Sequence, residues 1–196
     1  MSDLAPFAVA VPILGSLAAF AAGVLRSKSG WAVAVVASVV QVAVAGTLAA
    51  AAFGDAGRVS YVVGGFEVPY GIELVVDGLA ATVLLLVAAV SLGVLAYARR
   101  AGPRSNPFYA VYLLLVAGLS GMTVTGDLFN MYVFLEITGL AAYALVASGD
   151  SGRSAVAALK YLLVGTVGAS LFLLGIGYAY VATGTLNMAE IGRAHV

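Results

Sequence analysis

Six long apolar runs dominate the chain, and short stretches rich in Gly, Pro, Ser or charge separate them. A helix needs about 20 apolar residues to cross the hydrocarbon core of a bilayer. The runs therefore predict six transmembrane helices, approximately over residues 4–25, 31–53, 75–98, 108–124, 128–148 and 154–181. The turns between them are short, so neighbouring helices are expected to pack antiparallel.

One polar connection is longer than the others. Residues 58–77, RVSYVVGGFEVPYGIELVVD, contain two short β-rich runs separated by Gly64, Gly65, Pro69 and Gly71. This pattern predicts a small external hairpin between helices two and three. The expected fold class is all-α, a polytopic membrane protein of about six transmembrane helices with this hairpin. Its acidic residues either attract cations to an entrance or belong to a solvated cap.

Composition supports the membrane assignment. Hydrophobic residues make up 63% of the chain, charged residues 9%, and the mean hydropathy is +1.09. Nine basic and nine acidic residues cancel, so nothing indicates a nucleic-acid partner. The chain has no cysteine and only one histidine, His195. This composition excludes disulfides and histidine-based or thiolate metal sites. We therefore expect no cofactor and no metal.

Basic residues predict the orientation. Loops one, three and five carry six of them, whereas the loops on the other face carry only Arg58. By the positive-inside rule the odd loops are cytoplasmic and the N-terminus is outside, in a multi-pass protein of the plasma membrane. The first run begins with Asp3 instead of a basic region, so we interpret it as a retained helix and not a cleaved signal. The six basic residues are Arg26, Lys28, Arg99, Arg100, Arg104 and Arg153.

Glu136 lies near the middle of the fifth predicted helix, about 12 to 18 Å from either end. A central carboxylate costs about 2.5 to 3.5 kcal/mol to insert, so it is rare unless it faces a partner, a water-filled cavity or an ion pathway. Either Glu136 transfers protons, or it is a neutral carboxyl hydrogen-bonded to a neighbouring helix. We expect the first, because a membrane-embedded carboxyl can load and unload a proton.

Lys160 lies about two turns into helix six. Its ammonium either reaches the headgroups or acts together with Glu136 on the adjacent antiparallel helix, at a depth differing by about 10 Å. A lysine near the carboxyl favours its ionised form, so the two residues, coupled through water, make a proton switch.

Other polar residues carry weaker signals. Asp127 and Asn130 open helix five, where they either cap the helix or form an ion entrance. Thr138, Tyr143 and Thr166 interrupt apolar stretches. They either line a hydrated path or make hydrogen bonds between helices.

Two long stretches, GLSGMTVTGDLFNMYVFLEITGLAAYALVA and SAVAALKYLLVGTVGASLFLLGIGYAYVATGTLNMAE, carry a family resemblance. With the upstream YVVGGFEVPYGIELVVDGLAA, they resemble the D subunit of the multisubunit Mrp-type Na⁺/H⁺ antiporters. The wider group includes the antiporter-like subunits of respiratory complex I and membrane-bound hydrogenases. The resemblance implies a proton-conducting subunit in which the helix-five glutamate, here Glu136, is essential, and it places the helix-six lysine at Lys160.

The leading hypothesis is a subunit of a hetero-oligomeric antiporter that exchanges protons for sodium or another monovalent cation. The alternative is a proton-pumping membrane subunit of an NADH:quinone oxidoreductase or a membrane-bound hydrogenase, whose redox centres lie in other subunits. A third reading is a purely structural membrane subunit in which Glu136 and Lys160 form a fixed ion pair.

The resemblance also implies a longer protein, because family members continue into further helices. The last six residues, IGRAHV, match the translation of a common sequencing-library adapter. We expect residues 1–190 to be the N-terminal transmembrane part of the subunit and residues 191–196 to be an artefact, in which case Arg193 and His195 have no role.

Overall fold

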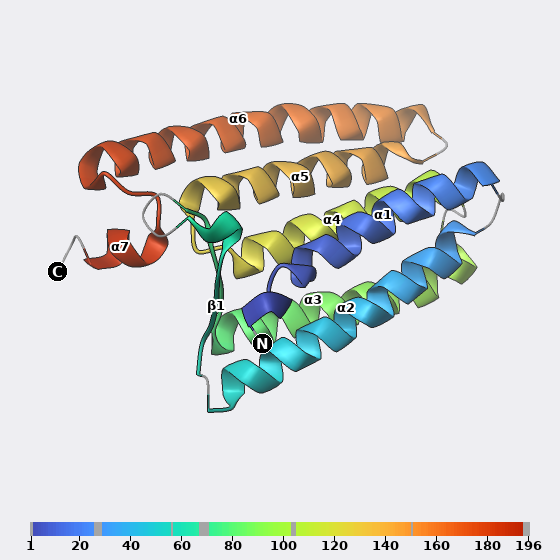
Figure 1. Cartoon of the computed structure of the whole chain (residues 1–196). Helices are drawn as coiled ribbons and strands as arrows, with labels where there is room; N and C mark the ends of the chain where they lie inside the picture. Colours follow the sequence, from blue (N-terminus) through green and yellow to red (C-terminus); the bar gives the residue numbers. More distant parts are fainter. Residues whose placement is uncertain are drawn as a thin grey trace.

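The computed structural model describes residues 2–25, 29–55, 57–66, 71–102, 105–149 and 151–193. Six helices in this part of the chain are long and apolar enough to cross a membrane, so the protein is a multi-pass membrane protein (Figure 1). They are α1 (Phe7–Leu25), α2 (Gly30–Phe53), α3 (Gly78–Ala101), α4 (Asn106–Val124), α5 (Leu128–Ala147) and α6 (Gly152–Thr183). Short 3₁₀ turns, η1 (Ser2–Leu4) and η2 (Val63–Gly65), and a C-terminal helix, α7 (Met188–Arg193), complete the helical elements.

The six predicted spans are confirmed, and each predicted boundary lies within three residues of the corresponding helix end. Helix α3 begins at Gly78, three residues later than predicted, because the apolar residues before it continue a β-strand. Asp77 separates the two elements: its side chain accepts a hydrogen bond from the backbone N–H of Ala80 at 2.8 Å. Such a cap satisfies a backbone donor that the first helical turn leaves free.

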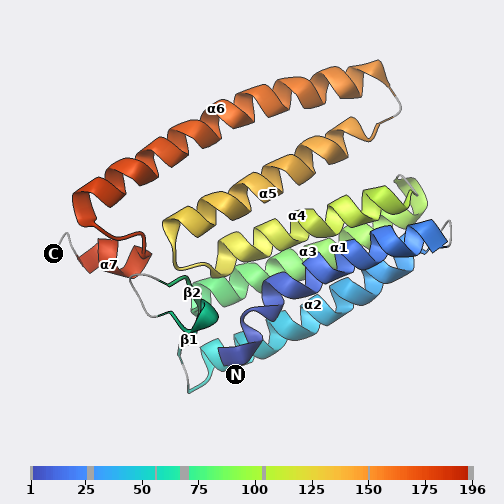
Figure 2. The ribbon, with the colours of Figure 1, turned by 45° about the horizontal axis from the view of Figure 1, so that its top comes forward.

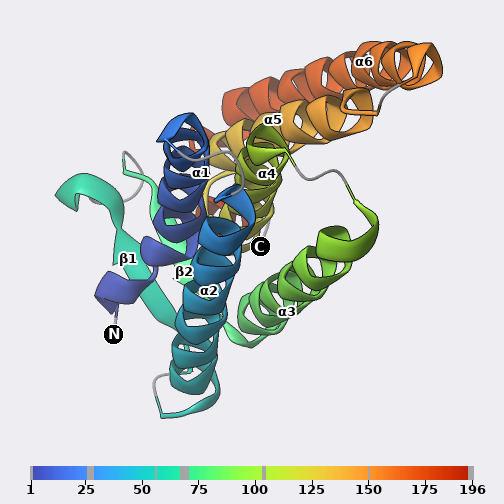
Figure 3. The same ribbon diagram turned by 90° about the vertical axis from the view of Figure 1, so that its right-hand side faces the viewer.

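Helix α4 occupies the centre of the bundle and packs against α1, α2, α3 and α5. Helix α6 packs against α5, so these two form an outer pair on one side of α4 (Figures 2 and 3). Small residues allow α4 and α5 to approach closely. A Cβ at Gly118 would collide with the hydroxyl of Thr138, and one at Gly121 would collide with the Phe134 ring.

A buried glutamine compensates for a proline in α1. Pro12 has no N–H, so the carbonyl oxygen of Ala8, one turn earlier, has no donor within its own helix. The side-chain Nε2 of Gln41 on α2 donates to that oxygen at 2.8 Å and to the Ser120 hydroxyl of α4 at 3.1 Å. Gln41 therefore ties three helices together where the bilayer offers no water to satisfy the free carbonyl.

The chain segments at one end of the bundle pair edge to edge. Strands β1 (Val59–Val62) and β2 (Glu73–Val76) form an antiparallel ladder between α2 and α3. Beyond β2, the backbone of Gly126 donates to the carbonyl of Glu73 at 2.8 Å, and the backbone of Met188 donates to Gly126 at 2.9 Å. Glu67 and Pro69 of the predicted hairpin lie outside the described residues, and the external location of the hairpin stays a prediction.

Candidate functional site at Glu136

Glu136 is the ninth residue of the 20-residue helix α5. At 1.5 Å per residue, it lies about 12 Å from the first residue of the helix and about 17 Å from the last. Phe134 and Thr138 face α4, as their proximity to Gly121 and Gly118 shows. Residues two apart on a helix lie on nearly opposite sides, so Glu136 lies on the side of α5 away from α4, where it is half-buried.

Two tyrosines share this side of α5 with Glu136. Tyr132 precedes it by one turn and Tyr143 follows it by about two turns, and both interact electrostatically with its carboxyl group. A Cβ built on Gly139 would lie 3.2 Å from the Tyr143 hydroxyl. The hydroxyl therefore points back along the helix toward Glu136, the direction in which helical side chains lean.

The tyrosines also fix how α5 meets α6. The rings of Tyr143 and Tyr161 meet edge to face, with centroids 4.7 Å apart and planes at 80°. A Cβ on Gly165 would overlap the Tyr143 hydroxyl, so this glycine of α6 creates the space for it. The two contacts place residues 143 and 161 at the same height on antiparallel helices, which brings Glu136 to the height of about residue 168.

Lys160 lies elsewhere on α6. By the same register it is about 12 Å from Glu136 along the helix axes, toward the end of the bundle that carries Arg153. The buried residues of α6 are Ala158, Ala169 and Ile176, whereas Lys160, two positions beyond the first of them, is exposed. Its side chain is therefore on the exposed face, where it lines a cavity of about 420 Å³ with Arg153. Among the described residues, Glu136 and Lys160 form no ion pair.

Asp127 and Asn130 make local hydrogen bonds at the start of α5. The carboxylate of Asp127 accepts a hydrogen bond from the backbone N–H of Asn130 at 2.7 Å, and the Asn130 side chain donates to the Thr125 hydroxyl at 3.0 Å. Of the three hydroxyls proposed to line a path, those of Thr138 and Thr166 bond within their own helices. Thr138 donates to the Phe134 carbonyl and Thr166 to the Leu162 carbonyl, each at 2.8 Å.

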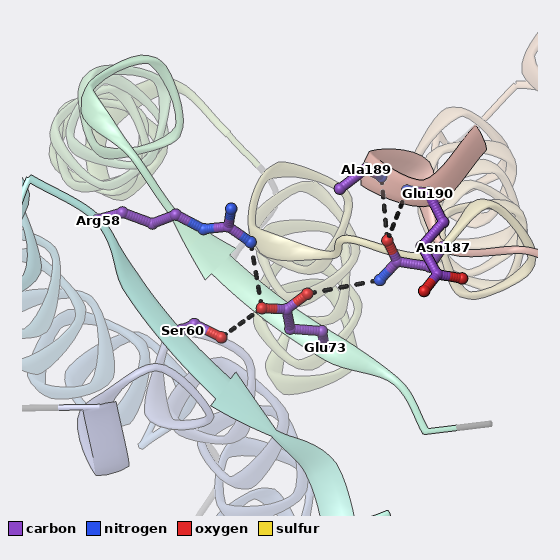
Figure 4. A network of polar contacts seen from close by, with 6 residues as sticks. All are labelled: Arg58, Ser60, Glu73, Asn187, Ala189 and Glu190. Atoms are coloured by element: carbon purple, nitrogen blue, oxygen red, sulfur yellow. Dashed lines mark hydrogen bonds and ion pairs between the residues drawn. The ribbon is translucent and has the colours of Figure 1, made fainter. Parts of the chain in front are cut away.

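Glu73, one of the acidic residues of the predicted hairpin, lies at the centre of a polar network (Figure 4). Its carboxylate accepts hydrogen bonds from Arg58 at 3.1 Å, from the hydroxyl of Ser60, and from Asn187 at 3.4 Å. The side chain is only 14% exposed. Glu73 and Arg58 also line a cavity of about 460 Å³, together with residues of α3, α4 and α5, and Glu136 is not among its lining residues. The contact with Asn187 joins residues far apart in the sequence, so no local motif signals it.

Residues 125–196, which include Glu136, match the profile described as NADH:quinone oxidoreductase/Mrp antiporter, transmembrane. The N subunit of the NADH-quinone oxidoreductase of Desulforudis audaxviator is 54% identical over 67% of this chain and 27% of its own length. Residues 125–196 therefore belong to the NADH:quinone oxidoreductase/Mrp antiporter membrane family.

A second curated relative and a solved structure also resemble the chain. The D subunit of the Na(+)/H(+) antiporter of Bacillus subtilis is 40% identical over 65% of this chain and 27% of its own length. A chain of the membrane-bound sulfane sulfur reductase, an archaeal respiratory membrane complex, superposes with a TM-score of 0.88 and 32% identity, over 95% of this chain and 39% of that chain. The chain thus spans about a quarter of the length of the curated relatives it matches.

Proposed function

We propose that the chain is a proton-conducting membrane subunit of a multisubunit antiporter that exchanges protons for a monovalent cation, with Na⁺ the expected one. The observation that carries the proposal is Glu136, a carboxyl at the middle of a membrane-spanning helix with the hydroxyls of Tyr132 and Tyr143 on the same side. A carboxyl at this depth is costly to keep unless it exchanges protons with a partner or a hydrated path. Similarity to the D subunit of the Bacillus subtilis antiporter supports the same reading.

Lys160 is the proposed modulator of the charge on Glu136. A cation brought nearer favours the ionised carboxylate, and its withdrawal favours the protonated form. The edge-to-face pair of Tyr143 and Tyr161 lies between the two heights, so water beside these rings completes the connection. Asp127, Thr138 and Thr166 keep the roles of entrance and path that the sequence suggests for them.

A second candidate is the proton-pumping subunit of a redox-driven complex. The 54% identity to the N subunit of an NADH-quinone oxidoreductase and the resemblance to a chain of the archaeal respiratory complex favour it. Glu136 would carry out the same proton transfer, and electron transfer in other subunits would supply the energy.

The proposed setting is a hetero-oligomeric complex in the plasma membrane, with the N-terminus outside. Exposed apolar side chains on α5 and α6 suit contact with further membrane helices or lipid. Arg99, Arg100 and Arg153 at one end of the bundle, against Arg58 at the other, support the orientation. Arg26, Lys28 and Arg104 lie outside the described residues.

Transport by the assembled complex tests the role of Glu136. In everted vesicles, Glu136→Gln is expected to lower the cation-driven pH change roughly a hundredfold, because the amide cannot carry a proton. Asp55→Asn removes an exposed carboxylate outside the helices and should leave transport unchanged. Undiminished transport by Glu136→Gln, with normal complex assembly, would contradict the proposal.

Energy source separates the two candidates. An antiporter changes the vesicle pH when Na⁺ or K⁺ is added to an imposed proton gradient, without an electron donor. A redox-driven pump acidifies the vesicles only while NADH or another donor is oxidised. The activity that the unmodified complex shows identifies its class. Loss of that activity in Glu136→Gln would support the proton-transfer role of Glu136 in either class.

A further inference from the structure

At the end of the bundle opposite the β-ladder, one arginine is held in a fixed position. The guanidinium of Arg99 on α3 lies over the ring of Trp31 on α2, with its carbon 4.1 Å from the ring centroid. The indole N–H of Trp31 donates to the backbone carbonyl of Leu95 at 3.0 Å, which fixes the ring against α3. These contacts orient a cation in advance of any ligand.

The arginine belongs to a basic cavity. A space of about 600 Å³ is lined by Trp31, Ala96, Tyr97, Arg99 and Arg100, with no carboxylate among these residues. A guanidinium has planar N–H donors that can bind two oxygens of one phosphate. The cavity therefore suits an anion with several oxygens.

The position of the cavity in the membrane indicates that the anion is a lipid headgroup. Helix α3 has 24 residues and is about 36 Å long, more than the hydrocarbon thickness of about 30 Å. Its last turn, with Arg99 and Arg100, therefore lies at headgroup level, where Trp and Tyr are also favoured. From the cavity an exposed apolar stripe runs along α3 into the membrane, formed by Tyr97, Val94, Val90 and Leu86 at three- and four-residue spacing.

We propose that Trp31 and Arg99 form a binding site for an anionic phospholipid, with the phosphate on the guanidinium and an acyl chain along the Leu86–Tyr97 stripe of α3. Compensation of the helix dipole explains a basic residue at the end of α3. It does not explain the stacked indole, the cavity or the apolar stripe. Dipole compensation also requires no lipid, so dipole compensation and lipid binding predict different measurements.

Trp31 is the only tryptophan of the chain, so its fluorescence reports on this site directly. The full chain is reconstituted into vesicles of equal phosphatidylglycerol and phosphatidylcholine, with brominated acyl chains on one lipid or the other. We expect brominated phosphatidylglycerol to be enriched about fivefold over brominated phosphatidylcholine in its contact with Trp31, the factor typical of one basic residue near anionic lipid. In Arg99→Gln the two brominated lipids should quench equally.

Arg153→Gln is the matched control, because it removes an exposed arginine from the same end of the bundle but from α6. It should keep the wild-type preference, and an equal loss in this variant would reduce the effect to general surface charge and overturn the proposal. Arg99→Lys restores the cation at the end of α3, and we expect it to regain less than the full preference because an ammonium cannot bind a phosphate bidentately.

Inorganic phosphate separates a lipid from a free anion. Millimolar phosphate should leave the preference for brominated phosphatidylglycerol intact, because the acyl chain contributes to binding. Loss of the preference on adding phosphate would overturn the lipid assignment, as would an Arg99→Gln protein that is folded by circular dichroism and still prefers phosphatidylglycerol.

Discussion

The hydroxyl of Tyr143 on α5 occupies the space where a side chain at Gly165 of α6 would begin. This contact sets the height at which the two helices meet and directs the hydroxyl toward Glu136. The glycines of α6 therefore differ in whether a neighbouring side chain requires them. Gly165 is required by a close approach, whereas Gly168, Gly175 and Gly177 have no neighbour that a Cβ would touch.

Gly165→Ala should therefore displace Tyr143 and disturb the Glu136 site. We expect a transport rate in the assembled complex lowered about tenfold or more, because misplacement of catalytic groups by about 1 Å has effects of this order. Gly168→Ala, one turn further along the same helix, introduces the same methyl group without a contact and should transport normally. Equal rates in the two variants would show that the position of Tyr143 does not matter for transport.

Gln41 is expected to stabilise the bundle through the carbonyl that Pro12 leaves free. Gln41→Leu should lower the free energy of unfolding by about 1 to 3 kcal/mol, because the Ala8 oxygen then stays buried without a donor. Pro12→Ala restores an N–H within α1, so in that background the same Gln41→Leu change should cost less. A double-mutant cycle measured by unfolding in detergent gives the coupling. A coupling free energy of zero would contradict the idea that Gln41 compensates for Pro12.

Glu73 joins the β-ladder to the chain around Asn187. Glu73→Gln should speed hydrogen exchange at the Met188 amide, because it weakens the contacts that hold the pairing with Gly126 in place. Arg58→Gln should have a smaller effect, because Arg58 is 48% exposed and a half-exposed ion pair contributes little. A larger effect of Arg58→Gln would mean that the ion pair, and not the link to Asn187, organises this end.

The absence of cysteine allows the orientation to be measured with single introduced thiols. Ser2 and Ser105 are exposed, and the Ser105 side chain makes no capping bond, so cysteine at either position should be tolerated. In intact cells a membrane-impermeant maleimide should label Ser2→Cys and leave Ser105→Cys unlabelled. The reverse pattern would place the N-terminus inside.

The predicted spans agree with the helices to within a few residues because a physical length sets them. A bilayer requires about 20 apolar residues per crossing and an internal partner for every backbone polar group, so the sequence pattern alone gives six helices and the depth of Glu136. The predicted start of α3 was wrong by three residues because Leu74 and Val76 are apolar in either a strand or a helix.

The direction in which each side chain faces was not available from the pattern. Helix α5 is apolar around almost its whole circumference, so no stripe shows that Phe134 faces α4 while Glu136 faces away. The same holds for α6, where contact with α5 at Tyr161 turns Lys160 to the exposed face. Chain length and hydropathy alone predict which residues lie in the membrane and at what depth. Which of these residues meet depends on the packing between helices, because packing sets the rotation and register of each helix.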